Sequence, residues 1–158
     1  MEKKPLKRDP NLLQLSRDHH DGLLFCWKLR EGVRYGAESA RIAPYVQYFW
    51  KQHLHHHFDE EEQFLFAEVQ DNLVRKAMDD HQEIRHMIAQ ITADPLPALF
   101  TRLAELLGAH IRFEERQLFP HLEKILGKQE LAEIGKKLAL ANESKKDDFP
   151  DQFWVMGK

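Results

Sequence analysis

Two stretches of this 158-residue chain carry the same arrangement of histidine and glutamate. His57 is followed four residues later by Glu61, and His110 is followed four residues later by Glu114. Residues four apart on a helix share one face, so each pair can offer an imidazole and a carboxylate to one cation. In both stretches a second glutamate comes next, and Leu-Phe follows three residues after it. The repetition indicates two helices that carry the same metal-binding pair.

Two lone histidines, each preceded by aspartate, complete the pattern: Asp18-His19 and Asp80-His81. The chain therefore presents a lone histidine and then an HxxxE pair, twice over. His19 continues the apolar stripe of its expected helix, whereas His20 points away from that stripe. The stripe consists of Leu12, Leu15, Leu23, Cys26 and Leu29. We expect His19 to face inward, with His20 as the open alternative.

Six side chains would meet at one level of a helical core, and four neutral imidazoles with two carboxylates are untenable there without a cation. Nitrogen and oxygen donors without a thiolate suit Fe, Mn, Zn or Ni better than Ca or Cu(I). The predicted ligands are His19, His57, Glu61, His81, His110 and Glu114. We interpret the remaining histidines, His20, His53, His55, His56, His86 and His121, as surface or core-rim residues.

Helical spacing of apolar residues recurs along the chain, and alternating β patterns are absent. The first expected helix covers 11–30, and the second runs from 39 to about 74. A short turn is expected near 70–72, and the third helix runs from there to about 92. The fourth and fifth expected helices cover 99–126 and 129–142. Gly32 and Gly36 would end the first helix, Pro44 would lie in the first turn of the second, and Asp94-Pro95-Leu96-Pro97 would end the third. The predicted fold class is all-α: an antiparallel up-down-up-down four-helix bundle with a short C-terminal fifth helix and tail.

The length suits one domain over residues 1–158. In this interpretation the bundle covers about 11–126, and the C-terminal helix and tail cover 127–158. We expect residues 1–10 to be a poorly ordered lead-in. The tail carries Phe149, Phe153 and Trp154, which we expect to dock on the bundle.

A net charge of −3 with interspersed basic and acidic residues argues against a nucleic-acid partner. No apolar stretch is long enough to cross a membrane, and the first residues do not look like a signal peptide. We therefore expect a soluble, cytoplasmic protein without a membrane partner. The single Cys26 lies in an apolar helical stretch, which favours a buried, unreactive thiol.

The six residues and the two Glu-Glu and Leu-Phe signatures resemble the hemerythrin-like, or HHE cation-binding, domain family, over about Leu12 to Leu126. The resemblance implies a non-haem centre of two iron ions, oxo- or hydroxo-bridged, with Zn or Mn as substitutes. It implies histidines as terminal ligands and Glu61 and Glu114 as bridges. Its partner would be a small diatomic or peroxide ligand.

One position departs from the oxygen-carrying members of that family. They have a histidine four residues after the third-helix ligand, where this chain has Arg85, and His86 lies about 140° around the helix from His81. Four imidazoles, two bridging carboxylates and a solvent bridge supply about ten of about twelve octahedral bonds, so about one position stays open on each ion.

Open positions on both ions favour a protein that senses, scavenges or reduces dioxygen, peroxide or nitric oxide. Two alternatives remain open: a metal-responsive regulatory module without catalysis, and reversible oxygen binding or storage. The sequence does not identify an electron donor or protein partner, and it does not decide whether the protein is an enzyme. Ferritin-like chemistry is disfavoured because only Glu83 and His86 match the Glu-x-x-His motif of those proteins.

Overall fold

The computed structural model describes residues 7–67, 69–141 and 147–157. These residues form helices and no β-strand, which confirms the all-α class. The elements are η1 (Pro10–Leu12), α1 (Leu13–Arg34), α2 (Ser39–Phe49), η2 (Trp50–Leu54), α3 (His55–Glu60), η3 (Glu61–Leu65), α4 (Asn72–Ala93), α5 (Pro97–Phe113), η4 (Glu114–Leu118), α6 (Phe119–Ile125) and α7 (Lys128–Ala141). In the described part of the chain, no helix is both long and apolar enough to cross a membrane.

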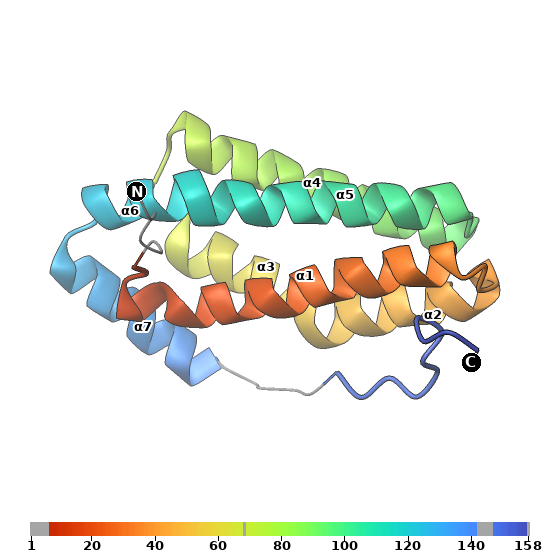
Figure 1. Cartoon of the computed structure of the whole chain (residues 1–158). Helices are drawn as coiled ribbons and strands as arrows, with labels where there is room; N and C mark the ends of the chain where they lie inside the picture. Colours follow the sequence, from red (N-terminus) through yellow and green to blue (C-terminus); the bar gives the residue numbers. More distant parts are fainter. Residues whose placement is uncertain (1–6, 68, 142–146, 158) are drawn as a thin grey trace, which may run out of the picture.

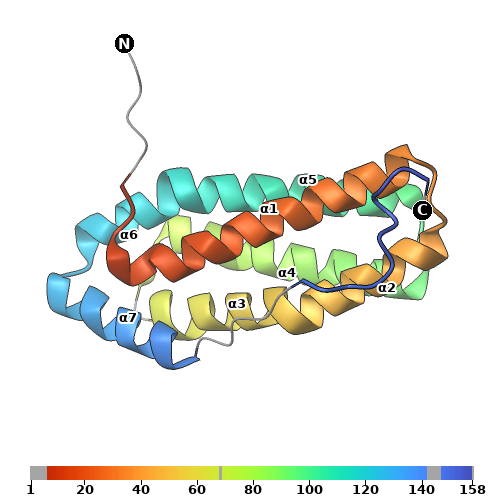
Figure 2. The same ribbon diagram turned by 60° about the horizontal axis from the view of Figure 1, so that its bottom comes forward.

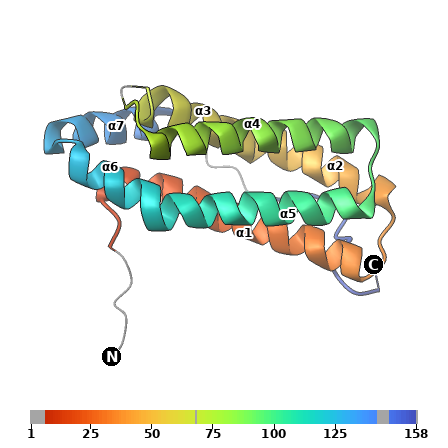
Figure 3. The same ribbon diagram turned by 90° about the horizontal axis from the view of Figure 1, so that it is seen from above.

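The long helical segments lie lengthwise beside one another (Figure 1). The colours of Figure 1 run from left to right along α1 and from right to left along α5, and these two helices have the most extensive contact in the molecule. Seen from above, α4 lies beside the segment that α2 and α3 form (Figure 3). The shorter α7 lies across the end where α1 begins (Figure 2) and packs against η1.

Two apolar clusters fill the interior, one toward each end of the long helices. One contains Phe25, Phe49 and Ile88, and the other contains Leu15 and Phe119. Each cluster draws on all the long segments, because every one of them buries an apolar stripe. The stripes are interrupted at one level by polar residues, and this polar level lies between the two clusters.

The first helix is longer than the sequence suggested. Gly32 was expected to end it, but α1 continues to Arg34, and the turn comes at Gly36, whose φ of 72° favours glycine. Gly32 is instead buried, and a Cβ atom there would lie 2.5 Å from a ring carbon of Phe153. The packing of the C-terminal tail explains why residue 32 is a glycine. The expected inward position of Leu23 was also wrong, since 38% of that residue is exposed.

The second expected helix was too long. It ends at Leu65 rather than near residue 74, and α4 begins at Asn72 after a non-helical connection. Asp71 caps α4, because its carboxylate accepts a hydrogen bond from the Val74 amide at 3.0 Å. Pro44 lies inside α2 and not in its first turn, contrary to expectation. The restart of the apolar stripe had indicated a turn near residues 70–72, which agrees with the start of α4 at Asn72. The end of the preceding helix was placed too late because the connecting residues Phe66 and Val69 also pack on the core.

The remaining helix predictions agree with the structure. The helix expected over 99–126 is the continuous run of α5, η4 and α6, and the proline-rich stop before it places Pro97 in the first turn of α5. The fifth helix is α7, although its expected last residue, 142, lies outside the described residues.

The docking of the C-terminal tail is confirmed. Phe153 is 1% exposed, and the rings of Phe149 and Trp154 lie 5.1 and 5.4 Å from that of Tyr45. Two ion pairs hold the same segment: Lys28 to Asp147 at 3.0 Å and Arg41 to Asp151 at 2.7 Å.

The end of the lead-in is better held than expected. Residues 1–6 lie outside the described part, but Arg8 forms an ion pair with Glu123 and donates a hydrogen bond to the Glu115 carbonyl at 2.7 Å. The guanidinium also lies over the Phe119 ring. The expectation of poor order is therefore wrong for Arg8, because the partly buried acidic side chain of Glu123 fixes its guanidinium.

Candidate metal centre

All six predicted ligands lie together in the polar level of the core. None exposes more than 4% of its surface, and both glutamates are completely buried. His19 comes from α1 and His81 from α4, while the two HxxxE pairs come from the α3–η3 and α5–η4 segments. His20 is exposed, so the choice of His19 as the inward histidine is confirmed.

The six residues form two groups that share both glutamates. One group is His19, His57, Glu61 and Glu114, and the other is His81, His110, Glu61 and Glu114. Within each group, one nitrogen or oxygen atom from every residue lies within 4.8 Å of the others. Two cations could therefore each take two imidazoles and a share of both carboxylates.

Most of the facing atoms in this cluster lack a hydrogen-bond partner; the exception is Nε2 of His19, which lies 2.8 Å from Oε1 of Glu114. Among the described residues, the Nε2 atoms of His57, His81 and His110 and both carboxylate oxygens of Glu61 are buried without a hydrogen bond. Glu61 Oε1 lies 3.2 Å from His57 Nε2 and 3.1 Å from His81 Nε2. Buried polar atoms without partners are costly, and an imidazole nitrogen beside a carboxylate is a suitable donor set for Fe, Mn or Zn. The residues therefore fit a pair of such ions.

Each of the four imidazoles is held from behind by a second carboxylate. The Nδ1 atoms lie 2.7–3.0 Å from these carboxylates, in the pairs His19–Glu115, His57–Asp18, His81–Glu62 and His110–Asp80. A carboxylate at Nδ1 fixes the ring and its tautomer so that Nε2 is free to bind a metal. Such outer partners are typical of metal-binding histidines.

The sequence reasoning did not identify these four acids as partners of the histidines. The signal was present, since an aspartate precedes each lone histidine and a second glutamate follows each HxxxE pair. The partner relation was hidden because it crosses between helices: Asp18 of α1 contacts His57 of α3, and Glu115 of η4 contacts His19 of α1.

We call the four carboxylates at the Nδ1 atoms the outer acids. Basic side chains lie beside three of them. Arg85 lies 2.8 Å from Glu62, Lys76 lies 2.9 Å from Asp80, and Arg8 lies 3.7 Å from Glu115. Arg85, four residues after His81, holds the carboxylate of Glu62 in place. His86 is exposed, so it cannot serve as a further ligand.

Both HxxxE segments change from α-helix to π-helix at the shared glutamate. The π turns η3 and η4 begin at Glu61 and Glu114, which the sequence reasoning had treated as ordinary α-helix. A π turn inserts an extra residue into the helix and often marks a functional site. Each π turn ends on the leucine of a buried Leu-Phe pair, so the turn returns the segment to the core beyond the polar level.

Without a cation, protons take over part of the charge balance. Burial alone would lower the pKa of the imidazoles, but the adjacent carboxylates raise it above the ordinary value in all four, and to about 10 in His110. Burial would raise the pKa of Glu114, but the adjacent imidazoles of His110 and His19 hold it well below its usual range. A metal entering this cluster must therefore displace protons.

The thiol of Cys26 has no part in the cluster. It is buried, and burial raises its pKa to about 12. The prediction that this thiol is buried is confirmed.

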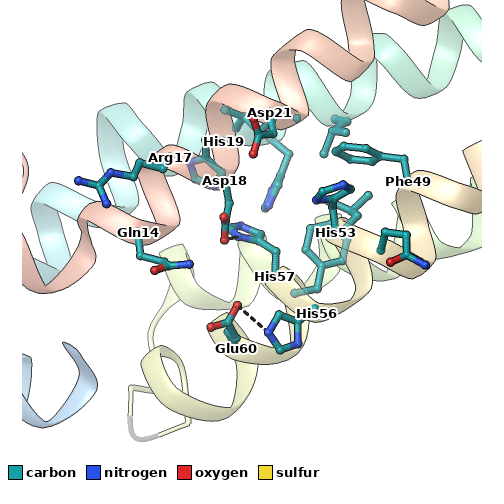
Figure 4. Close-up of a pocket in the computed structure, with 17 residues that line it drawn as sticks. Gln14, Arg17, Asp18, His19, Asp21, Phe49, His53, His56, His57 and Glu60 are labelled. Atoms are coloured by element: carbon teal, nitrogen blue, oxygen red, sulfur yellow. Dashed lines mark hydrogen bonds and ion pairs between the residues drawn. The ribbon is translucent and has the colours of Figure 1, made fainter. Parts of the chain in front are cut away.

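A cavity of about 180 Å³ opens beside the cluster, between α1 and the α2–α3 segment (Figure 4). His19, His57 and His110 contribute to its wall. Its other walls combine acidic and imidazole groups with apolar side chains, among them Asp18, Asp21, His53, Glu60, Phe49 and Leu107.

Comparison with known proteins gave one match. A family model described as Hemerythrin HHE cation binding domain matches residues 13–122, which include all six clustered residues and the four outer acids. Nothing among curated proteins or solved structures matches the chain in the corresponding comparisons.

Proposed function

Because the chain belongs to the hemerythrin HHE cation-binding domain family, we propose that it is a non-haem di-iron protein that senses, scavenges or reduces dioxygen, peroxide or nitric oxide. One observation carries the proposal above all others. Two groups of buried nitrogen and oxygen atoms share Glu61 and Glu114, which supports a bridging role for both carboxylates.

In this proposal His19 and His57 would hold one iron and His81 and His110 the other, and Glu61 and Glu114 would serve both. When bound, two ferrous ions supply two electrons, which together with two protons reduce one hydrogen peroxide molecule to two water molecules. The protein keeps the imidazoles oriented through the outer acids and keeps bulk water away with the apolar clusters on both sides.

The absence of a fifth histidine ligand supports reaction over reversible carriage. The equivalent position, Arg85, is engaged with Glu62 at 2.8 Å, and its guanidinium has no lone pair to offer a metal. Each ion therefore has two imidazoles, and neither is saturated by protein ligands alone.

The wider setting is also part of the proposal. We read the four long segments as an antiparallel up-down-up-down bundle within a single domain over residues 1–158. The opposite directions of α1 and α5 in Figure 1 and their extensive contact support this topology. We further propose a cytoplasmic protein that has neither nucleic-acid nor membrane partners, supported by the balanced charge of the chain.

A metal-responsive regulatory module is the second candidate. It would require metal occupancy to control the C-terminal tail. The ion pairs of the tail involve Lys28 and Arg41, and its rings pack on Tyr45, none of which belongs to the cluster. These contacts favour the di-iron reading.

The test is metal analysis of protein purified without chelator, combined with an absorption spectrum. The proposal expects about two irons per chain and a near-ultraviolet band from the bridged ferric pair, which zinc would not give. A Glu114→Ala variant should lose most of the iron. Stoichiometric zinc without iron, or full iron in Glu114→Ala, would contradict the proposal.

A further inference from the structure

The segment α3 carries a second histidine and glutamate four residues apart, beside the pair that belongs to the centre. His56 and Glu60 each stand one residue before His57 and Glu61. Figure 4 marks the ion pair between them, in which His56 Nε2 lies 3.5 Å from Glu60 Oε1. Both residues line the cavity, and neither belongs to the two groups of clustered residues. The proposed function leaves this pair without a role.

The internal repeat indicates that the centre does not need this pair. In the second half of the chain the matched positions, one residue before His110 and Glu114, are Ala109 and Phe113. Phe113 is 7% exposed and belongs to an apolar cluster. Glu60 is 3% exposed at the corresponding place. A carboxylate buried so deeply costs free energy unless a partner compensates it, and an apolar residue would avoid that cost.

The hydrogen bonds of the Glu60 carboxylate are incomplete. Its Oε2 atom is buried and has no hydrogen bond among the described residues. Its Oε1 atom faces His56 Nε2, but that nitrogen also lies 2.9 Å from the carbonyl oxygen of Ala141, where α7 ends. A single proton on Nε2 can point at only one of these two oxygens. The buried carboxylate is therefore left partly unpaired within the described part of the chain.

These donor atoms have the spacing of metal ligands. Donor atoms bonded to one ion at about 2.1 Å lie about 3.0–3.4 Å apart. His56 Nε2 is separated from the two oxygens by 2.9 and 3.5 Å, which is close to that spacing. Carbonyl groups at the C-terminal end of a helix carry partial negative charge, which favours a cation. The adjoining cavity leaves room for water molecules that would complete the coordination.

We propose that His56, Glu60 and the carbonyl group of Ala141 form a third cation-binding site, which takes a zinc or manganese ion and fastens the end of α7 to α3. One imidazole with two oxygen donors suits these ions. Each position of the centre offers two imidazoles, so the third site holds its ion more weakly. The ion replaces a single hydrogen bond between the two helices with coordination by both. The inference goes beyond the proposed function and does not depend on which metal the centre holds.

The first test counts zinc ions at one buffered free zinc concentration, above that needed to fill the centre. We expect about three zinc ions per chain in the wild type and about two in both His56→Ala and Glu60→Gln. His55→Ala is the matched control and should keep about three zinc ions. His55 Nε2 forms an ion pair of the same four-residue spacing with Asp59 at 3.4 Å, but both of these side chains are exposed.

Only two zinc ions in the wild type, or an equal loss in His55→Ala and His56→Ala, would overturn the inference. Glu60→Gln keeps the size and shape of the buried side chain, and circular dichroism checks that each variant is folded. A wild type that fills the centre with zinc but takes up no third ion would overturn this inference alone. A wild type that binds the third zinc but takes up no iron would overturn the proposed function alone.

The second test needs no variant. Anomalous diffraction from crystals of the zinc-loaded wild type, collected on both sides of the zinc absorption edge, should show a zinc peak between His56, Glu60 and the carbonyl group of Ala141. The absence of a peak at this place would overturn the inference even if every variant fails to fold.

Amide hydrogen exchange tests whether the ion fastens α7. Exchange in residues 128–141 should become slower when the zinc concentration rises from a level that fills only the centre to one that also fills the third site. We expect this change in the wild type and in His55→Ala, and no change in His56→Ala. Unchanged exchange in the wild type would show that the ion does not fasten α7 to α3.

Discussion

The four histidines proposed as ligands are buried beside carboxylates, so replacing one of them should lower the metal content of the protein. His19 is 4% exposed within the cluster, while its neighbour His20 is exposed. We expect His19→Ala to lose most of its metal and His20→Ala to retain it, measured as metal per chain after gel filtration. Equal loading of the two variants would show that His19 is not a ligand.

An outer acid should matter through the histidine it orients. Asp80 lies 3.0 Å from Nδ1 of His110, so Asp80→Asn should weaken metal binding by about 10- to 100-fold. Asp79→Asn is the matched control, since its exposed side chain lies outside the cluster. Competition with a chelator of known affinity measures both. A similar metal affinity in the two variants would show that the carboxylate behind His110 does not contribute to metal binding.

At the scale of single residues, the sequence pattern located the cluster well because the spacing of metal-binding residue types matches the helical repeat. The same helical face had to carry His57 and Glu61, and their repeat removed the competing pair His56 and Glu60. Glu60 was passed over for that reason, although it is 3% exposed and lines the cavity. A cavity depends on side chains from several helices, so no spacing along one helix predicts it.

At the scale of elements, the end of α1 is tied to the tail through Gly32. Gly32→Ala would place a methyl group 2.5 Å from Phe153, so the tail must shift. We expect faster amide hydrogen exchange in residues 147–157 and a loss of about 1–3 kcal/mol of unfolding free energy. Metal content should stay unchanged, because the tail contacts no ligand.

Gly108→Ala is the control for this change, because a Cβ there meets only the movable end of Arg112, 3.3 Å away. Tail exchange equal in the two variants would mean that Gly32 does not hold the tail. Loss of metal from Gly32→Ala would instead couple tail and centre, in favour of the regulatory alternative.

Helix ends were the least predictable elements, for a physical reason. A helix ends where the backbone turns, but apolar spacing records only which side chains are buried. Phe66 stays buried after η3 has ended, so the pattern placed the end of that helix too late, although the restart of the apolar stripe did indicate the turn near 70–72. Glycine is common at helix ends, but Gly32 instead makes room for the ring of Phe153. No local sequence pattern records that distant contact. The π turns were missed likewise, because Glu61 and Glu114 give no distinct signal for them.

At the scale of the whole molecule, the metal-free and metal-loaded forms should respond oppositely to pH. Raised imidazole pKa values stabilise the metal-free fold below the unfolded value of about 6.5, and this contribution is lost as pH rises through the folded values, about 10 for His110. The lowered pKa of Glu114 adds stability above about 4.5 that is lost as pH falls through the folded value. Metal binding gains with pH because it displaces protons.

The difference in melting temperature between loaded and chelator-treated protein should therefore grow from about pH 6 to about pH 9. Near neutral pH we expect a difference on the order of 10 °C, corresponding to about 3–4 kcal/mol at a free metal concentration 100- to 1,000-fold above the dissociation constant. Differential scanning calorimetry at several pH values measures it. A difference that shrinks with rising pH would show that histidines are not the principal ligands.

The central claim is that two ions occupy one buried cluster and share two glutamates. Anomalous diffraction from crystals of the iron-loaded protein, collected on both sides of the iron absorption edge, tests it most directly. The account predicts two iron peaks, one beside His19 and His57 and one beside His81 and His110, with Glu61 and Glu114 between them. A single peak, or iron bound outside these six residues, would contradict it.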